Sequence, residues 1–102
     1  MAEVRWTSQA IKDIDSISEY IARDSEHYAK IQAQRFFDIV IILETQPSYG
    51  KIVPEKQDPS LRELLLGSYR IIYRIVTDNR IDIITVHHSK RLLSNNPTIK
   101  KL

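Results

Sequence analysis

The sequence predicts an α+β fold in the order β-α-α-β-β-β, with two helices packed on one face of an antiparallel sheet. In the first half of the chain, apolar residues recur at helical spacing. In the second half, three runs rich in Ile, Val, Tyr and Leu are separated by turn-type residue pairs. The 102 residues are enough for one core, so residues 1–102 are expected to form a single domain.

The first strand and the first helix are predicted from the N-terminal residues. Residues 3–6 alternate polar and apolar side chains, as a half-buried strand does. Thr7 and Ser8 then supply side-chain oxygens that suit a helix N-cap. A helix from about Ser8 to Arg23 is expected, because apolar residues return at helical spacing at Ile11, Ile14, Ile17 and Ile21.

The second helix carries more apolar surface than one buried stripe needs. Asp24 or Ser25 can cap its start, and Pro47 lies beyond its end. The main stripe consists of Ala29, Ala33, Phe36, Val40 and Leu43. Other apolar residues, including Phe37 and Ile41, spread over the remaining faces of its second half. Two interpretations stay open: these side chains enter the core, or they form a face for a partner protein or a second copy of the chain.

The predicted strands of the second half are Leu61–Leu66, Tyr69–Thr77 and Arg80–His88. A Gly-Ser pair and an Asp-Asn pair connect them, and connections this short force antiparallel hairpins. Residues 51–60 contain two prolines and are expected to form an irregular loop. The tail from Ser89 predicts at most a short helix.

Strand periodicity sorts the side chains of the middle strand into two faces. The better core face consists of Tyr69, Ile71, Tyr73 and Ile75. Arg70 and Arg74 then belong to the face away from the helices. A two-residue turn places Arg70 opposite His87 on the last strand, whereas a one-residue bulge brings His88 beside it. Which histidine flanks Arg70 therefore stays open.

Positive charge is concentrated in the C-terminal half of the chain. Residues 1–50 contain five Lys and Arg against eight Asp and Glu, a net charge of −3. Residues 51–102 contain ten against five, a net charge of +5. Such a half favours a polyanionic partner, meaning nucleic acid, a nucleoprotein or an acidic protein segment, over ordinary solvated surface charge.

Residue content argues against several classes of site. There is no cysteine, which removes disulfides, thiolate metal sites and cysteine nucleophiles. Neighbouring histidines on a strand point to opposite faces, so no metal is expected, and without a glycine-rich loop no cofactor is expected. The longest apolar run, residues 39–43, is too short to cross a membrane, and no signal-peptide pattern occurs. We expect a cytoplasmic protein without membrane contact.

A basic cluster near the end of the last strand suits phosphate chemistry. Its members are Arg70, one of His87 and His88, Lys90 and Arg91. Arginine grips two oxygens of a phosphodiester, and histidine moves a proton near neutral pH. For each residue alone, a structural explanation is favoured over a functional one. Together they favour a functional site.

Motifs along nearly the whole chain resemble those of the RelE/ParE superfamily of bacterial toxins. In order, they are residues 6–10 (WTSQA), 46–50 (QPSYG), 61–64 (LREL), 67–74 (GSYRIIYR) and 86–91 (VHHSKR). Each motif alone is weak, and the ordered set is specific. The resemblance implies a growth-inhibiting toxin that a cognate antitoxin neutralises by wrapping around it. Phe37 and Ile41 are the expected antitoxin contacts, and a homodimer within the complex stays open.

The resemblance implies two alternative targets. ParE-like members inhibit DNA gyrase, and the motifs of the second half are closer to that branch. RelE-like members cleave mRNA on the ribosome, in which case Arg70, His88 and Arg91 would be catalytic. The residues after Arg91 lack the tyrosine or histidine–tyrosine pair with which those ribonucleases often end. A third alternative is a detoxified relative that only binds its antitoxin. The expected target-binding or phosphate-binding residues are Arg62, Arg70, Arg74, His87, Lys90 and Arg91.

Overall fold

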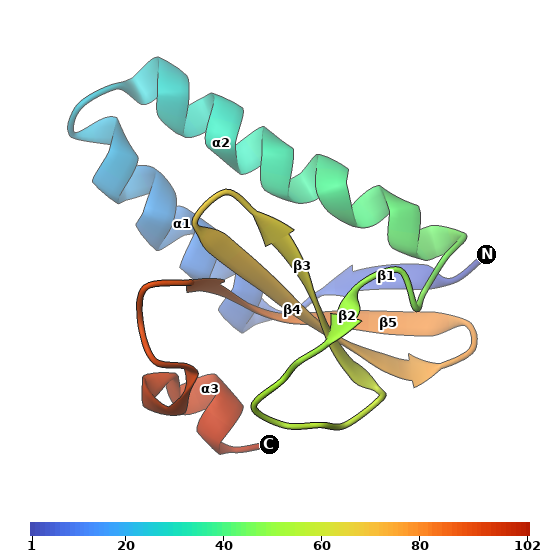
Figure 1. Cartoon of the computed structure of the whole chain (residues 1–102). Helices are drawn as coiled ribbons and strands as arrows, with labels where there is room; N and C mark the ends of the chain where they lie inside the picture. Colours follow the sequence, from blue (N-terminus) through green and yellow to red (C-terminus); the bar gives the residue numbers. More distant parts are fainter.

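The computed structural model describes residues 1–102, which form five strands, three α-helices and two short 3-10 helices (Figure 1). The strands lie in the order β1-β5-β4-β3-β2. In chain order, the elements are β1 (Glu3–Trp6), α1 (Ser8–Ala22), α2 (Glu26–Ile39), η1 (Val40–Glu44), β2 (Lys51–Ile52), β3 (Leu61–Leu66), β4 (Tyr69–Thr77), β5 (Arg80–His88), η2 (Leu93–Asn95) and α3 (Pro97–Lys100).

Both predicted long helices are present, and a side chain caps each of them. Thr7 Oγ1 accepts a hydrogen bond of 3.2 Å from the Ala10 amide at the start of α1. Ser25 Oγ accepts one of 3.0 Å from the Tyr28 amide at the start of α2. Beyond Ile39 the second helix tightens into η1, so the apolar stripe continues on a 3-10 helix. None of the helices combines the length and apolarity that crossing a bilayer requires.

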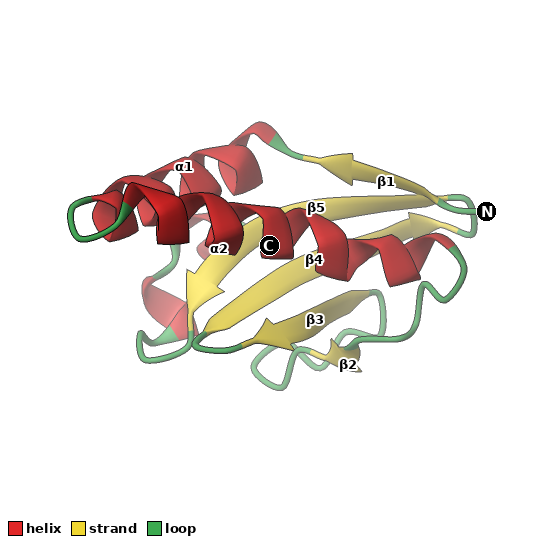
Figure 2. Ribbon diagram, turned by 90° about the horizontal axis from the view of Figure 1, so that it is seen from above, coloured by secondary structure: helices red, strands yellow, loops and turns green.

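The helices α1 and α2 form one layer across one face of the sheet (Figure 2). The core between the layers joins α1, α2 and η1 to the inner face of the sheet and includes the fully buried Phe36, Leu43, Ile71 and Tyr73. The predicted core face of β4 is confirmed, because Tyr69 and Ile75 pack against the same cluster. The α+β fold predicted from the sequence is therefore confirmed.

The sheet is mixed rather than wholly antiparallel. β1 pairs in parallel with β5, from Glu3 opposite Arg80 to Trp6 opposite Ile83. The hairpin argument applies only to strands joined by short turns, and the long chain between β1 and β5 permits a parallel pair. The segment expected to be an irregular loop also begins with a strand, because β2 pairs with the edge of β3.

The second face of the sheet is covered, contrary to the expectation of an open face. A second apolar cluster lies there, and its members are Val53, Leu61, Ile72, Leu93 and Ile99. The tail supplies Leu93 and Ile99, each only 2% exposed, and α3 lies on the side of the sheet opposite to α1 and α2 (Figure 1). The face was expected to be open because both long helices were assigned to the other face. Ile72 on this face is instead fully buried under the tail.

The pairing of β4 with β5 places His87, and not His88, opposite Arg70. The register predicted from a two-residue turn holds at both ends of the hairpin, at Thr77 with Arg80 and at Arg70 with His87. Two irregularities between these pairs cancel each other: β5 has an extra residue near Ile72/Tyr73, and β4 has one near Ile75/Thr77.

Candidate functional site

The segment Ser89–Arg91, which we call the basic turn, follows directly after β5. The Ser89 amide donates a 2.7 Å hydrogen bond to the Ser68 carbonyl, and the Arg91 amide donates one of 3.0 Å to the His88 carbonyl. The Lys90 amide donates to Nδ1 of His88 at 3.1 Å. The backbone of the turn is thereby fixed. The side chains of Lys90 and Arg91 are exposed, and neither takes part in any ion pair.

A groove of about 1110 Å³, the C-terminal groove, runs between α1 and the segment after β5. Lys90, Arg91 and His88 line it, and so does Arg23, the residue directly after α1. Tyr69 also lines the groove, and its ring meets that of His88 edge to face with centroids 5.3 Å apart. Cationic and aromatic side chains thus converge on one hollow, which suits a partner that carries negative charge.

Asp13 fixes the α1 wall of the C-terminal groove to the sheet. Its carboxylate accepts a short hydrogen bond from the Thr85 hydroxyl and one of 3.0 Å from the Val86 amide. Thr85 is 1% exposed, so this contact is shielded from water. The acid is therefore occupied by the sheet, which leaves Glu19 as the other carboxylate among the residues that line the groove.

His87 lies inside the fold and not on an open sheet face, and it is 6% exposed. Its Nε2 lies 2.9 Å from the Arg91 carbonyl oxygen, and its Nδ1 lies 3.1 Å from the side-chain amide nitrogen of Asn96. The ring thus joins the basic turn to the residue that caps α3. Both histidines line the C-terminal groove, and His88 is the more accessible of the two.

Arg70 is enclosed by two carboxylates, so it is not free to meet a phosphate in this structure. Its guanidinium donates two hydrogen bonds of 2.8 Å to Glu55, and its Nε donates one of 2.7 Å to Glu63. The Arg70 side chain is 11% exposed and that of Glu63 only 2%. Lys51 adds a second cation at 3.5 Å from Glu63. We call Arg70, Glu55 and Glu63 the arginine clamp.

The clamp changes the acidity of its exposed carboxylate. The hydrogen bonds from Arg70 lower the pKa of Glu55 to about 2, although partial burial opposes this shift. The carboxylates in turn raise the pKa of Arg70. Both shifts favour the charged forms, which is the behaviour of an ion pair and not of a proton donor poised for catalysis.

The other two predicted target-binding arginines are also engaged within the fold. Arg74 Nη1 donates to the Ser60 hydroxyl at 2.9 Å and lies 3.4 Å from Asp58. Arg62 donates two hydrogen bonds of 3.0 Å to the carbonyl oxygens of Pro59 and Gly50. Their role in target binding stays a prediction. The structure brings together His88, Lys90 and Arg91 along the C-terminal groove, whose lining does not include the clamp residues.

The predicted antitoxin contacts, Phe37 of α2 and Ile41 of η1, are exposed. Phe37 is 37% exposed and packs on Trp6 of β1 with ring centroids 4.8 Å apart, and Ile41 is 57% exposed. Of the apolar residues outside the main stripe, Ile39 and Ile42 pack against the core, whereas Phe37 and Ile41 are exposed, and a partner on these two stays a prediction.

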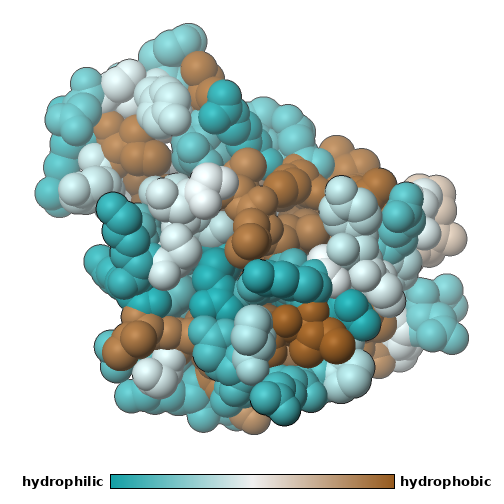
Figure 3. Space-filling view, in the orientation of Figure 1, coloured by the Kyte–Doolittle hydropathy of each residue, from teal (hydrophilic) through white to brown (hydrophobic).

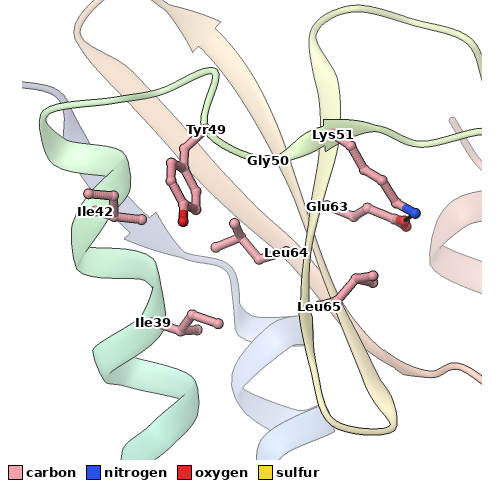
Figure 4. Close-up of a pocket in the computed structure, with 8 residues that line it drawn as sticks. All are labelled: Ile39, Ile42, Tyr49, Gly50, Lys51, Glu63, Leu64 and Leu65. Atoms are coloured by element: carbon pink, nitrogen blue, oxygen red, sulfur yellow. Dashed lines mark ion pairs between the residues drawn. The ribbon is translucent and has the colours of Figure 1, made fainter.

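A second apolar surface lies between α2 and β3, where hydrophobic residues gather in Figure 3. It is hollowed by a pocket of about 500 Å³. The eight lining residues, drawn in Figure 4, are Ile39, Ile42, Tyr49, Gly50, Lys51, Glu63, Leu64 and Leu65. We call this pocket the apolar hollow. β2 pairs only with Arg62 and Glu63, so the outer edge of β3 has no strand beside it at residues 64–66.

Sequence reasoning missed the partners of the predicted site residues. Glu55 and Glu63 were assigned no role, and Asn96 was part of a tail expected to do little. Only Glu63 carried a signal, because an acidic residue inside an otherwise apolar strand is rarely buried without a cation. The structure groups no three His, Asp or Glu side chains in a way that could hold a metal ion.

Residues 4–93 match the family model described as ParE toxin of type II toxin-antitoxin system, parDE. Toxin RelE2 of Caulobacter vibrioides is 30% identical over 92 residues, which cover 90% of this chain and all of that protein. A solved structure titled "Chromosomal ParDE TA system from P. aeruginosa" superimposes with a TM-score of 0.71 at 24% identity. The match covers 86% of this chain and 96% of that one.

These matches, together with the helical layer on a mixed sheet, define a class of protein. The chain belongs to the ParE toxin family of type II toxin–antitoxin systems. It is the toxin component of such a system, and its partner is a cognate antitoxin. The resemblance seen in the sequence is thereby confirmed, and the shared fold is seen in the solved structure.

Proposed function

We propose that this toxin inhibits DNA gyrase without catalysing a reaction, and that the C-terminal groove and the basic turn contact the target. The observation that carries the proposal is which cationic side chains are free and which are paired with carboxylates. Lys90 and Arg91 are exposed without a carboxylate partner, whereas Arg70 is enclosed in the arginine clamp. A binding surface needs free cations on the outside, which the basic turn supplies. Gyrase bound to DNA is a target that carries phosphate charge.

A supercoiling assay with purified gyrase tests this proposal. Wild-type toxin is expected to inhibit supercoiling, and the double substitution Lys90→Gln/Arg91→Gln is expected to weaken inhibition at least ten-fold. The matched control is Lys30→Gln/Arg35→Gln, which removes the same charge from exposed positions on α2. Full supercoiling in the presence of excess wild-type toxin would overturn the proposal. Equal inhibition by the two double variants would exclude the basic turn as a target contact.

Ribosome-dependent cleavage of mRNA is the second candidate, and His88 is the observation that favours it. Its accessible ring borders the C-terminal groove beside Tyr69, Lys90 and Arg91, and an imidazole and a phenol are both able to move protons. Primer extension on mRNA in a translating extract should then show new cuts that His88→Ala abolishes. If the mRNA stays intact in the extract at excess toxin, this second candidate is excluded. A toxin that is harmless without antitoxin would indicate a detoxified relative.

We infer that the antitoxin covers Phe37 and Ile41 and extends into the apolar hollow. An exposed apolar helix face suits an amphipathic helix, and the free edge of β3 at residues 64–66 suits an added strand. Phe37 packs on Trp6 of β1, whereas the apolar hollow lies beside β3, so an antitoxin that covers both surfaces has to cross the α2–η1 segment. Burial of apolar side chains would offset the entropy lost when the antitoxin becomes ordered.

Co-purification tests the antitoxin surface. Phe37→Ser/Ile41→Ser is expected to reduce affinity for the cognate antitoxin at least ten-fold, because each side chain buries apolar area in the complex. Val76→Ser is the control, since Val76 is 42% exposed on β4. Unchanged affinity of the Phe37/Ile41 variant, measured by calorimetry, would exclude this face as the antitoxin site. The oligomeric state of the purified complex, from light scattering, would decide whether the toxin also pairs with a second copy.

A further inference from the structure

The side-chain amide of Asn96 has only one orientation that fits its surroundings. Its Oδ1 accepts hydrogen bonds from the amides of Thr98 at 2.9 Å and Ile99 at 3.3 Å, and so caps α3. Its Nδ2 must then face Nδ1 of His87 at 3.1 Å. Exchanging the oxygen and the nitrogen would place a donor against the two helix amides and lose the cap.

This orientation also fixes the protonation of His87. Asn96 Nδ2 is a donor, so Nδ1 of His87 must accept and therefore carries no proton. The carbonyl of Arg91 is an acceptor, so Nε2 of His87, 2.9 Å away, must carry the ring proton. Only the neutral ring protonated on Nε2 satisfies both partners. A second proton, on Nδ1, would place the N–H of His87 against the N–H of Asn96. His87 is only 6% exposed, so water could not relieve this conflict.

The two bonds of His87 hold different parts of the C-terminal segment. One reaches the backbone of the basic turn at Arg91, and the other reaches the cap of α3. Between them the chain is anchored by Leu93, and beyond them by Ile99, which pack into the second apolar cluster. His87 is therefore the polar contact that ties the position of the basic turn to the docking of α3.

We propose that His87 is a positioning residue: its neutral ring holds the basic turn and α3 against the sheet, and its protonation releases them. Leu93 and Ile99 oppose the release, so acid shifts a population between docked and undocked segments and does not unfold the chain. The effect of this docking on target inhibition rests on the proposed function. The dependence of docking on His87 does not rest on it.

Charged groups on every neighbouring element act on this ring. Arg70 of β4 lies at the paired position and disfavours a second cation. Glu55 of the loop and Glu63 of β3 favour one, but both are bound to Arg70. Asp13 of α1 is separated from the ring by Thr85, to which it is bonded. Glu55, Glu63 and Asp13 are thus each bonded to another group, and Glu19 of α1 is the remaining carboxylate in the groove that His87 lines.

Methyl NMR of the full-length toxin from about pH 8 to about pH 5, the range in which histidine changes charge, tests the docking. The methyl signals of Leu93 and Ile99 are expected to shift toward undocked values in acid, with the undocked population rising about ten-fold. His87→Gln keeps a donor and an acceptor on a side chain that does not titrate, so its docking should not depend on pH. His27→Gln, at an exposed position on α2, should behave as wild type.

Asn96→Asp provides the sharpest test, because it should reverse the direction in which acid changes docking. One carboxylate oxygen still caps α3, and the other faces Nδ1 of His87, where it prefers a protonated ring. Acid should therefore strengthen docking in Asn96→Asp and weaken it in the wild type. The proposal is overturned if wild-type docking does not change with pH, or if Asn96→Asp responds to acid as the wild type does.

The functional arm compares inhibition of supercoiling at about pH 8 and about pH 6. Wild-type toxin should lose potency at the lower pH several-fold more than His87→Gln does, with the uninhibited enzyme as the reference at each pH. Equal loss by both would overturn the positioning role. Wild-type toxin that never inhibits gyrase would refute the proposed target and leave the NMR result to decide whether His87 controls docking.

Discussion

Loss of the arginine clamp should destabilise the protein by about 3 kcal/mol, which is a large share of the roughly 5–15 kcal/mol that holds a typical domain folded. The perturbation is Arg70→Met, which keeps most of the side-chain volume and removes the charge. Glu63, with a side chain only 2% exposed, would keep Lys51 at 3.5 Å as its one cation. Breaking a buried ion pair costs about 3–5 kcal/mol. The expected loss is at the lower end of this range, because Lys51 still neutralises part of the charge of Glu63.

Urea denaturation at neutral pH measures this loss, and two further variants identify its origin. Arg70→Met/Glu63→Gln removes the stranded charge and should recover most of the stability. Arg74→Met removes an arginine whose partner Asp58 has a side chain 44% exposed, so it should cost under about 1 kcal/mol. A loss below about 1 kcal/mol for Arg70→Met would refute the reasoning, because Arg70 would then be a free surface cation.

The clamp also predicts how stability depends on pH. The folded-state pKa of Glu55 is about 2 against an ordinary value of 4.5, so the carboxylate contributes stability above about pH 4.5 that is lost as the pH falls toward 2. The side chain of Glu55 is 45% exposed, so screening by water limits the contribution to about 1 kcal/mol. Urea midpoints between pH 5 and pH 2 should fall less steeply in Arg70→Met. Parallel curves for the two proteins would contradict this account.

Three further substitutions should lower stability as read from thermal unfolding. Gly50→Ala should cost about 2 kcal/mol, because a Cβ there would lie 2.5 Å from the Glu63 carbonyl oxygen and 2.7 Å from the Tyr73 hydroxyl. Tyr73→Phe should cost about 1–3 kcal/mol, since the buried amide of Gly50 donates to that hydroxyl at 2.9 Å. Thr7→Ala should cost about 1 kcal/mol through loss of the cap on the Ala10 amide. An unchanged melting temperature in any of them would contradict the contact on which it rests.

The local chemistry of turns and caps explains why much of the fold could be predicted. Thr7 and Ser25 carry the cap oxygens, and the two-residue turn after Thr77 sets the antiparallel hairpin of β4 and β5. The cancelling irregularities inside the hairpin were not predictable, because strand periodicity says nothing about where an extra residue is accommodated. Of the two alternatives left open for Arg70, the structure has the pair with His87, and only residues 73–75 of β4 are shifted by one position.

The site was predictable only in part because side-chain partners come from distant segments. Arg70 meets Glu55, fifteen residues away, across a loop whose path no periodicity determines. The same limit applies to the tail, since Ile99 docks on Ile72 through tertiary packing and not through a local signal. By contrast, the exposure of Lys90 and Arg91 follows from their place directly after a strand end, where turns reach the surface.

The internal ion pairs also reduce the number of cations of residues 51–102 that are free to meet an anionic partner. Of the ten Lys and Arg in this half, four are bound to carboxylates of the same half, and Arg62 is bound to backbone carbonyls. The cations left without such contacts are Lys56, Lys90, Arg91, Lys100 and Lys101. All but Lys56 belong to the segment that His87 and the second apolar cluster hold in place. The charge available to an anionic partner is therefore concentrated in the one segment whose docking depends on the neutral state of a histidine.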